Sequence, residues 1–248
     1  MKITFLGTGY AIPTKERNCV CTMLEAGGGI YLIDAGAPAA ELLQHYGKKV
    51  TDIRAMFATH QHGDHVNGMI PLLDLGTWCY KQWQADIYLA EEKAVPVFQS
   101  MIETSLGRTF EGDRLRMHVV SEGLVYEDAF IRVTAYPTRH LFPSGRPSYA
   151  YLVEGEGKRI LITGDLSHHL ADNDVPSIAM EEPLDLMVTE MAHFTREEAA
   201  PTLARLRVKE LCFHHVPQDP AKEADFRALN GLYPYPVSVL RDGDIREW

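Results

Sequence analysis

Cysteine is scarce in this chain, and long apolar runs are lacking. The four cysteines (Cys19, Cys21, Cys79 and Cys212) form no Cys-x-x-Cys pair, which argues against a disulfide framework and favours reduced thiols in a cytoplasm. No stretch approaches the roughly 20 uninterrupted apolar residues that a membrane span needs. Residues 1–7 run directly into a predicted strand and show no signal-peptide pattern. We therefore expect a cytoplasmic protein that does not enter a membrane.

An excess of positive charge is also lacking. Lysine and arginine number 24 against 34 acidic residues, so the formal net charge is −10. A protein that holds nucleic acid by its phosphates usually has a basic patch, and here the basic residues are scattered. Nucleic acid is therefore not the partner we expect. A bound metal ion would supply local positive charge, so a small anionic substrate is compatible with the acidic surface.

The most informative stretch is residues 58–68, which read ATHQHGDHVNG. Three imidazoles and a carboxylate fall within six positions there: His60, His62, Asp64 and His65. An apolar run over 53–57 predicts a strand before them, and helical spacing predicts a helix that begins near His65 or Val66. Imidazole and carboxylate are ligands that Zn²⁺ prefers. A turn at Gly63 would point the four ligands in two directions, which suits two adjacent metal ions better than one.

The remaining chain alternates between predicted strands and helices. The segments expected to be strands are 2–6, 20–26, 30–34, 86–90, 115–120, 129–135, 149–154, 159–163, 184–189, 211–213 and 237–240. Helices are expected over 36–46, 91–106, 196–206 and 219–229. The hydrophobic content of 46% is ample for a core. With no internal repeat and no long linker, we expect a single domain over residues 1–248.

Further candidate ligands follow the ends of predicted strands. Four such residues each stand just past an apolar run: His60, His140, Asp165 and His215. Loops converge where several strand ends meet one edge of a layered fold, while the sheets hold those loops rigid. Two sheets with helices outside would provide that edge, so we expect these four side chains to lie together.

These residues resemble the pattern of the metallo-β-lactamase fold superfamily. The resemblance is carried by His60-x-His62-x-Asp64-His65, by the later His140, by Gly164-Asp165 and by His215. It spans nearly the whole chain and implies a four-layer αββα sandwich. Within the superfamily the sequence looks most similar to the RNase Z branch. That likeness is carried by FLGTG at 5–9, PTKERN at 13–18, and HFT at 193–195 with the helical segment that follows.

The resemblance also implies roles for individual residues. The first metal ion would be bound by His60, His62 and His140. The second would be bound by Asp64, His65 and His215, with Asp165 bridging the two ions. His214 remains an alternative to His215 as the last ligand. His193 would be the catalytic histidine near the leaving group, with Glu190 as its partner, and Asp64 is counted with these catalytic residues. The cofactors would be two divalent ions, Zn²⁺ first with Mn²⁺ or Fe²⁺ as alternatives, and relatives often form homodimers.

Three departures separate this chain from the tRNA-processing members. The family's Gly-Glu-Gly-Thr-Gln segment is replaced here by GAPAA at 36–40. Only 24 residues lie between His140 and Asp165, too few for the long arm with which such members clamp tRNA. The chain is also acidic. We therefore interpret it as a relative that kept the chemistry and lost the tRNA.

The predicted function is dinuclear metal-dependent hydrolysis of small phosphodiesters, such as cyclic or capped phosphates. A hydroxide between the metal ions would attack phosphorus, and a protonated His193 would donate to the leaving oxygen. Three alternatives stay open: hydrolysis of an ester, thioester or lactone, tRNA 3′-end processing, and metal binding without catalysis. Asp34 would accept a hydrogen bond from a ligand imidazole, or else serve only as a turn residue before Gly36.

Overall fold

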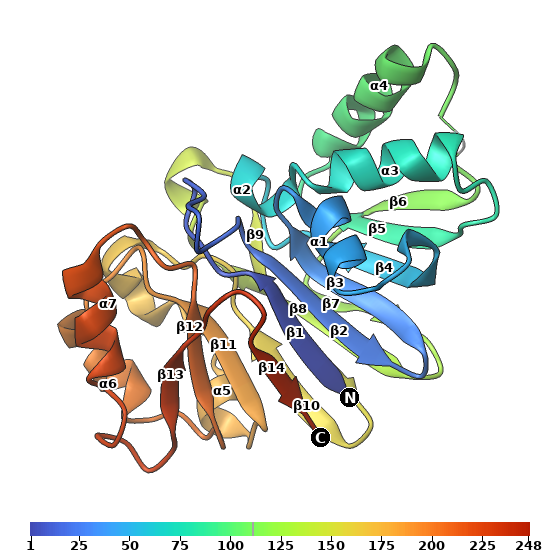
Figure 1. Ribbon diagram of the computed structural model, residues 1–248. Coiled ribbons are helices and arrows are strands. Elements are labelled where there is room, and N and C mark those ends of the chain that lie inside the picture. The colour runs from blue at the N-terminus through green and yellow to red at the C-terminus, as the bar shows by residue number, and fades with distance from the viewer. Residues whose placement is uncertain (111) are drawn as a thin grey trace.

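Two mixed β-sheets pack face to face at the centre of the molecule, and helices cover both outer faces (Figure 1). The computed structural model describes residues 1–110 and 112–248, with side chains at all of these except 171–173. Across these residues the layers follow the order helix, sheet, sheet, helix. The αββα sandwich predicted from the sequence is therefore confirmed.

The first sheet contains the N-terminal strands and has the order β14-β1-β2-β3-β4-β5-β6 within the described residues. Its strands are β1 (Lys2–Gly7), β2 (Cys21–Ala26), β3 (Gly29–Ala35), β4 (Ile53–Phe57), β5 (Ala85–Leu89), β6 (Leu115–Val119) and β14 (Ile245–Glu247). Strands β3 to β6 are parallel to one another, whereas β14, β1 and β2 pair antiparallel. The helices on this side of the molecule are α1 (Ala39–His45), α2 (Gly63–Val66), α3 (Met69–Trp78) and α4 (Ala94–Leu106), with a 3₁₀ turn η1 (Val50–Asp52).

The second sheet contains the C-terminal half and has the order β13-β12-β11-β10-β9-β8-β7 in the same described part of the chain. Its strands are β7 (Gly123–Glu127), β8 (Ile131–Thr138), β9 (Ser148–Gly155), β10 (Lys158–Ile162), β11 (Leu186–Glu190), β12 (Leu211–His214) and β13 (Val237–Val239). Strands β10 to β13 are parallel, and β7, β8 and β9 are antiparallel to their neighbours. The helical elements here are η2 (Phe142–Ser144), η3 (His168–Asn173), α5 (Ile178–Glu181), α6 (Arg196–Leu203) and α7 (Pro220–Arg227).

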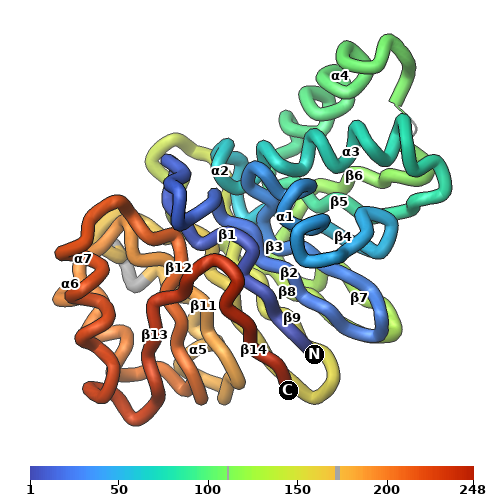
Figure 2. The backbone as a smooth tube through the Cα atoms, in the orientation of Figure 1, coloured from blue at the N-terminus to red at the C-terminus, as the bar shows by residue number. Residues whose placement is uncertain are grey.

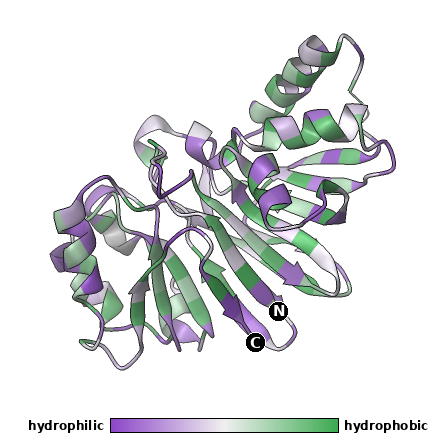
Figure 3. Ribbon diagram, viewed as in Figure 1, coloured by the Kyte–Doolittle hydropathy of each residue, from purple (hydrophilic) through white to green (hydrophobic). Residues whose placement is uncertain are grey.

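The central strands form because their apolar residues are buried on both faces of each sheet. In β10, Ile160 and Ile162 pack into the core between the sheets, while Leu161 packs into the core beneath α5 and α6. Strands buried on both faces are expected to be continuously apolar, and Figure 3 shows both sheets largely in the hydrophobic colour. This double burial makes the sheets a rigid support for the loops at their ends.

The carboxyl ends of β4, β8, β10, β11 and β12 meet at one edge of the sandwich (Figure 1). The candidate site lies in the loops at this edge. The tube in Figure 2 shows that the chain returns beside its own start at the opposite edge, because β14 pairs with β1. Among the residues that the structure describes, no helix has the length and apolar character to cross a membrane.

The helix after the ligand loop begins earlier than the sequence predicts. Instead of starting near His65 or Val66, α2 starts at Gly63, so Asp64 and His65 lie on its first turn. A second helix, α3, begins at Met69 after a break at Gly68. The cause is close packing: the Gly68 N–H donates to the carbonyl of Ala35 at 2.8 Å, and a Cβ at Gly68 would lie 2.6 Å from that oxygen. Strands β7 and β14 were not predicted, and both are half exposed or short.

Candidate metal centre

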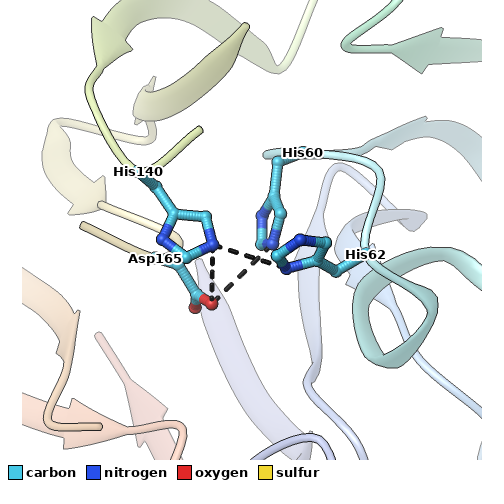
Figure 4. A group of neighbouring side chains, drawn as sticks. All are labelled: His60, His62, His140 and Asp165. Atoms are coloured by element: carbon cyan, nitrogen blue, oxygen red, sulfur yellow. Dashed lines mark hydrogen bonds and ion pairs between the residues drawn. The ribbon is translucent and has the colours of Figure 1, made fainter. Parts of the chain in front are cut away.

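Four side chains from three loops converge at the ends of β4, β8 and β10 (Figure 4). They are His60, His62, His140 and Asp165, and their donor atoms all lie within 4.8 Å of one another. Nε2 of His60 and Nε2 of His140 each lie 3.7 Å from Oδ2 of Asp165. Nε2 of His140 lies 3.4 Å from Nδ1 of His62. Three imidazoles and a carboxylate at these separations can surround one metal ion.

The other oxygen of Asp165 faces a second group, formed by Asp64, His65 and His215. Oδ1 of Asp165 lies 3.4 Å from Nε2 of His65 and 3.3 Å from Nδ1 of His215. Within the group, Nε2 of His215 lies 3.2 Å from Oδ2 of Asp64 and 3.4 Å from Nε2 of His65. Asp165 thus presents Oδ2 to the first group and Oδ1 to the second. This division suits a carboxylate between two neighbouring ions.

The two adjacent histidines at the end of β12, His214 and His215, have different environments. His214 ends β12, is fully buried and joins none of the ligand groups found among the described residues. Burial, with the neighbouring His215, lowers the pKa of His214 to about 3. His215 follows the strand with φ of 52°, a left-handed conformation that is uncommon outside glycine. The geometry therefore favours His215 as the ligand.

Hydrogen bonds on the outer side of His60, His65 and His140 hold Nδ1 of each ring and leave Nε2 facing the cluster. Nδ1 of His140 donates to the carbonyl of Leu166 at 3.1 Å, so Nε2 faces Asp165. Within residues 1–110 and 112–248, three buried atoms of the cluster have no hydrogen-bond partner: Nε2 of His60, Nδ1 of His215 and Oδ1 of Asp165. Buried polar atoms are normally paired. These orphaned atoms and the imidazole–carboxylate donor set fit divalent metal ions.

Asp34 holds the ligand loop of the first sheet in place. It stands at the end of β3 with φ of 55°, fully buried. Its carboxylate accepts hydrogen bonds from the Thr59 N–H at 2.8 Å, from the Thr59 hydroxyl at 2.9 Å and from Nδ1 of His65 at 2.7 Å. Burial would lower the pKa of His65, but the charges of Asp165 and Asp34 raise it well above its usual value. The interpretation of Asp34 as the partner of a ligand imidazole agrees with this contact.

Glu190 and His193 lie beside both groups at the end of β11. The buried Glu190 carboxylate accepts the N–H groups of Leu166, Ala192 and His193 at 2.8–2.9 Å, and Nδ1 of His193 at 2.8 Å. Burial would raise the pKa of Glu190, but hydrogen bonds from His193 and His215 lower it to about 2. For His193, burial would lower the pKa of the imidazole, but the hydrogen bond to Glu190 raises it. The ring is thus biased toward its protonated form and sits with its Nδ1 3.9 Å from Asp165.

Asp174 was not found from the sequence, although it links two ligand loops. Its two oxygens accept the backbone N–H groups of Arg139 and Ser167, each at 2.7 Å. Arg139 precedes His140, and Ser167 lies two residues after Asp165. Burial raises the pKa of Asp174. No strand end or motif precedes it in the sequence, so no signal marks it there.

Tyr10 is a second residue that the sequence interpretation missed. Its ring centroid lies 5.0 Å from that of His215 and 6.1 Å from that of His193, edge-on in both cases. Tyr10 directly follows the FLGTG segment that carried the resemblance, and this adjacency was an available signal. The ring of His168 lies 4.8 Å from that of His193.

Comparison with known proteins assigns this chain to a family. A family model described as Anti-Pycsar protein Apyc1 matches residues 1–200. The chain belongs to the Anti-Pycsar protein Apyc1 family. The matched residues of this Apyc1-family chain include the ligand loop, His140, Asp165 and His193, whereas His215 lies beyond them.

Curated relatives and solved structures agree with that placement. Ribonuclease Z from Gloeothece citriformis is 32% identical over 148 residues, which are 58% of this chain and 45% of that protein. The Apyc1-family chain thus spans about half the length of the curated relatives it matches. The metallo-β-lactamase fold protein YhfI from Bacillus subtilis superposes with a TM-score of 0.79 at 18% identity, covering 100% of this chain and 99% of the other. Human tRNase Z, short form, gives 0.76 at 23% identity, with coverage of 100% and 99%. The predicted RNase Z-like branch of the metallo-β-lactamase fold is confirmed.

Proposed function

We propose that the protein is a dinuclear metal-dependent hydrolase that cleaves small phosphodiesters. One observation carries the proposal: the two oxygens of Asp165 are divided between two groups of imidazole and carboxylate ligands. The first ion would be held by His60, His62 and His140, and the second by Asp64, His65 and His215. We assign Zn²⁺ to both positions, with Mn²⁺ and Fe²⁺ as alternatives, because the donors are imidazole and carboxylate.

The metal ions, when bound, would make a water molecule acidic near neutral pH and neutralise charge that builds on the phosphoryl oxygens. The chain's own residues orient the reaction. Asp34 and the carbonyl of Leu166 fix the ring nitrogens that face the ions, through His65 and His140. We also count Asp64 among the catalytic residues. Its carboxylate belongs to the second ligand group, with Oδ2 3.2 Å from Nε2 of His215.

His193 is the general acid in this proposal. Glu190 holds Nδ1 of the ring, so Nε2 is the nitrogen from which a proton can be given to the leaving oxygen. Burial would lower the pKa of His193, but the hydrogen bond to Glu190 raises it, which favours the protonated ring. Positioned proton transfer of this kind contributes roughly 10²–10⁴-fold to a rate. Hydrolysis of a carboxylic ester or lactone depends less on protonation of its leaving group than hydrolysis of a phosphodiester does, so it would depend less on His193.

A small substrate is favoured by charge and by the length of one loop. The formal net charge is −10, and only 24 residues lie between His140 and Asp165. A long RNA would bring many phosphates against an acidic surface, whose repulsion is greatest at low salt. The second candidate is cleavage of an RNA phosphodiester, which the names of the curated relatives favour. A precursor-tRNA cleavage assay distinguishes it from the first.

The first experiment is hydrolysis of bis(p-nitrophenyl) phosphate by protein reconstituted with Zn²⁺ or Mn²⁺. We expect turnover by the wild type and a loss of roughly 10²–10⁴-fold in His193→Ala. His45→Ala is the matched control, because His45 is exposed on α1 and away from the cluster. Hydrolysis of esters or lactones that survives His193→Ala, with no turnover of the phosphodiester, would support the carboxylic-ester alternative. Metal binding without turnover of either class would support a binding protein.

A further inference from the structure

The loop between β11 and α6 carries His193, and helix α7 contacts this loop on both sides of that residue. Nζ of Lys222 donates to the carbonyl of Ala192 at 2.7 Å. One turn further along α7, the ring centroid of Phe226 lies 6.1 Å from that of Phe194. Residues four apart in a helix share a face, so a single face of α7 holds both neighbours of His193.

The peptide group that joins Ala192 to His193 is bonded at both ends. Its carbonyl accepts a hydrogen bond from the Lys222 ammonium, and its N–H donates to the Glu190 carboxylate at 2.9 Å. The same carboxylate accepts Nδ1 of the His193 ring at 2.8 Å. Because a peptide group is planar, its carbonyl and its N–H turn together. Loss of the carbonyl's partner would therefore let the N–H turn away from Glu190.

The other backbone groups beside the His193 ring are bonded as well. The Ala192 N–H donates to Glu190 at 2.8 Å, and the His193 carbonyl accepts the N–H of His169 at 3.0 Å. Of the four backbone groups of Ala192 and His193, two bond to Glu190, one to His169 and one to Lys222. The contact from Lys222 thus completes the set that orients His193.

Helix α7 lies next to α6 on the outer side of the second sheet and provides a fixed base for this contact (Figure 1). The Asp219 carboxylate caps its first turn by accepting the N–H groups of Ala221 and Lys222, each at 3.0 Å. Glu223 accepts a hydrogen bond from Arg17 at 3.1 Å, which ties α7 to the loop after β1. Lys222 itself is half-buried, and a lysine ammonium is seldom buried without a bonded partner.

We propose that Lys222 is a positioning residue for His193: it fixes the peptide group between Ala192 and His193, and so holds the ring in the orientation from which Nε2 gives up its proton. The inference rests on the proposed function, because it takes His193 as the general acid. Lys222 acts through the loop and not by contact with the reacting atoms. A misplacement of about 1 Å can cost roughly 10²-fold in rate, so the orientation of this peptide group affects kcat.

The kinetic test measures hydrolysis of bis(p-nitrophenyl) phosphate by protein reconstituted with Zn²⁺. Lys222→Met keeps the aliphatic stem and removes the donor, so kcat should fall about 10–100-fold with KM within about twofold of wild type. Lys222→Arg keeps a cationic donor and should retain kcat within about fivefold of wild type. Lys209→Met is the matched control, because Lys209 is bonded to Asp185 at 2.8 Å. In a His193→Ala background, Lys222→Met should change the residual activity by less than about twofold, because the group it positions is gone.

The second test does not depend on hydrolysis. Amide hydrogen exchange of Ala192 and His193, followed by NMR with Zn²⁺ present, should become about tenfold faster in Lys222→Met. The N–H groups of β12 should exchange as in wild type, which excludes general unfolding as the cause. The positioning role is overturned if these two amides exchange no faster in Lys222→Met than in Lys209→Met, or if Lys222→Met lowers activity equally with and without His193. Failure of the proposed function has a different result: the two amides exchange faster in Lys222→Met although the wild type hydrolyses no phosphodiester.

Discussion

The two sheets supply their parts of the metal centre in different ways. The first sheet contributes His60, His62, Asp64 and His65 from one loop and one short helix, all within residues 60–65. The second sheet contributes His140, Asp165, Glu190, His193 and His215 from the ends of four strands, spread over residues 140–215. The first half is compact and the second is dispersed.

The supporting contacts differ in the same way. One carboxylate, Asp34, holds the compact loop by accepting hydrogen bonds from Thr59 and His65. The dispersed half needs Asp174 and Glu190, which accept backbone N–H groups from several loops at once. In the compact half the ligands are already held close together because they are neighbours in the sequence. In the dispersed half the buried carboxylates hold the separate loops together instead. A site assembled from distant segments therefore relies on buried carboxylates that connect its loops through backbone N–H groups.

The largest effect is expected from Asp165→Ala, because the two oxygens of Asp165 face the two ligand groups. Its loss leaves the imidazoles of each group without the shared carboxylate. We expect binding of at least one metal ion to be lost and activity on bis(p-nitrophenyl) phosphate to fall more than about 10³-fold. Metal content after dialysis and kcat are the measurements, and the exposed Asp225→Ala is the control. Retention of two tightly bound ions by Asp165→Ala would contradict the bridging role.

The second prediction concerns His193, the proposed general acid in the dispersed half, and its partner Glu190. Glu190 raises the pKa of His193, so the active, protonated form persists to higher pH and is lost as pH rises through that pKa. Glu190→Gln removes the negative charge, so the pKa of His193 should fall. We expect the alkaline limb of the kcat–pH profile to move to lower pH, with a rate loss of roughly 10–100-fold. An unmoved alkaline limb would assign that limb to another group.

This contrast explains how much of the site the sequence could predict. His60, His62, Asp64 and His65 form a local pattern, so their convergence follows from a strand, a turn and a helix. His140, Asp165 and His215 were found because each follows an apolar strand and because the resemblance supplied the topology. Asp174 had neither signal. Its contact with Arg139 and Ser167 exists only once β8 and β10 lie in the second sheet.

The limits of prediction in the fold have similar causes. Strands β7 and β14 were missed because the exposed residues of β7 and the three-residue length of β14 give no buried apolar run. Ligand roles, the single domain over 1–248, the cytoplasmic location and a homodimer stay predictions. Tyr10 lies in a loop whose position depends on Asp242, more than 200 residues away in the chain. Pairings of that range cannot be derived from local spacing.

An effect of similar size should distinguish the two halves directly. Asn keeps one acceptor but replaces the other oxygen with a donor, which cannot satisfy a facing N–H group. Asp34→Asn should weaken the second metal position through His65, and Asp174→Asn should weaken the first through His140. We expect each variant to lower the affinity of one of the two metal-binding steps by about 10–100-fold, measured by competition with a chelator. If both variants weakened the same step, the two halves would not be supported independently.

The smallest effect tests the contact between the halves. Gly164 in the dispersed half has φ of 61°, and a Cβ there would lie 2.5 Å from Cβ of Thr59 in the compact loop. Gly157 has φ of 73°, with nothing within 4 Å of such a Cβ. Both Gly→Ala changes carry the strain of a left-handed residue, about 1 kcal/mol, but only Gly164→Ala adds a clash. We expect Gly164→Ala to lower the free energy of unfolding by about 1–3 kcal/mol more than Gly157→Ala in urea denaturation. Equal losses would mean that Thr59 moves away freely, and that the two halves are not held in register at this point.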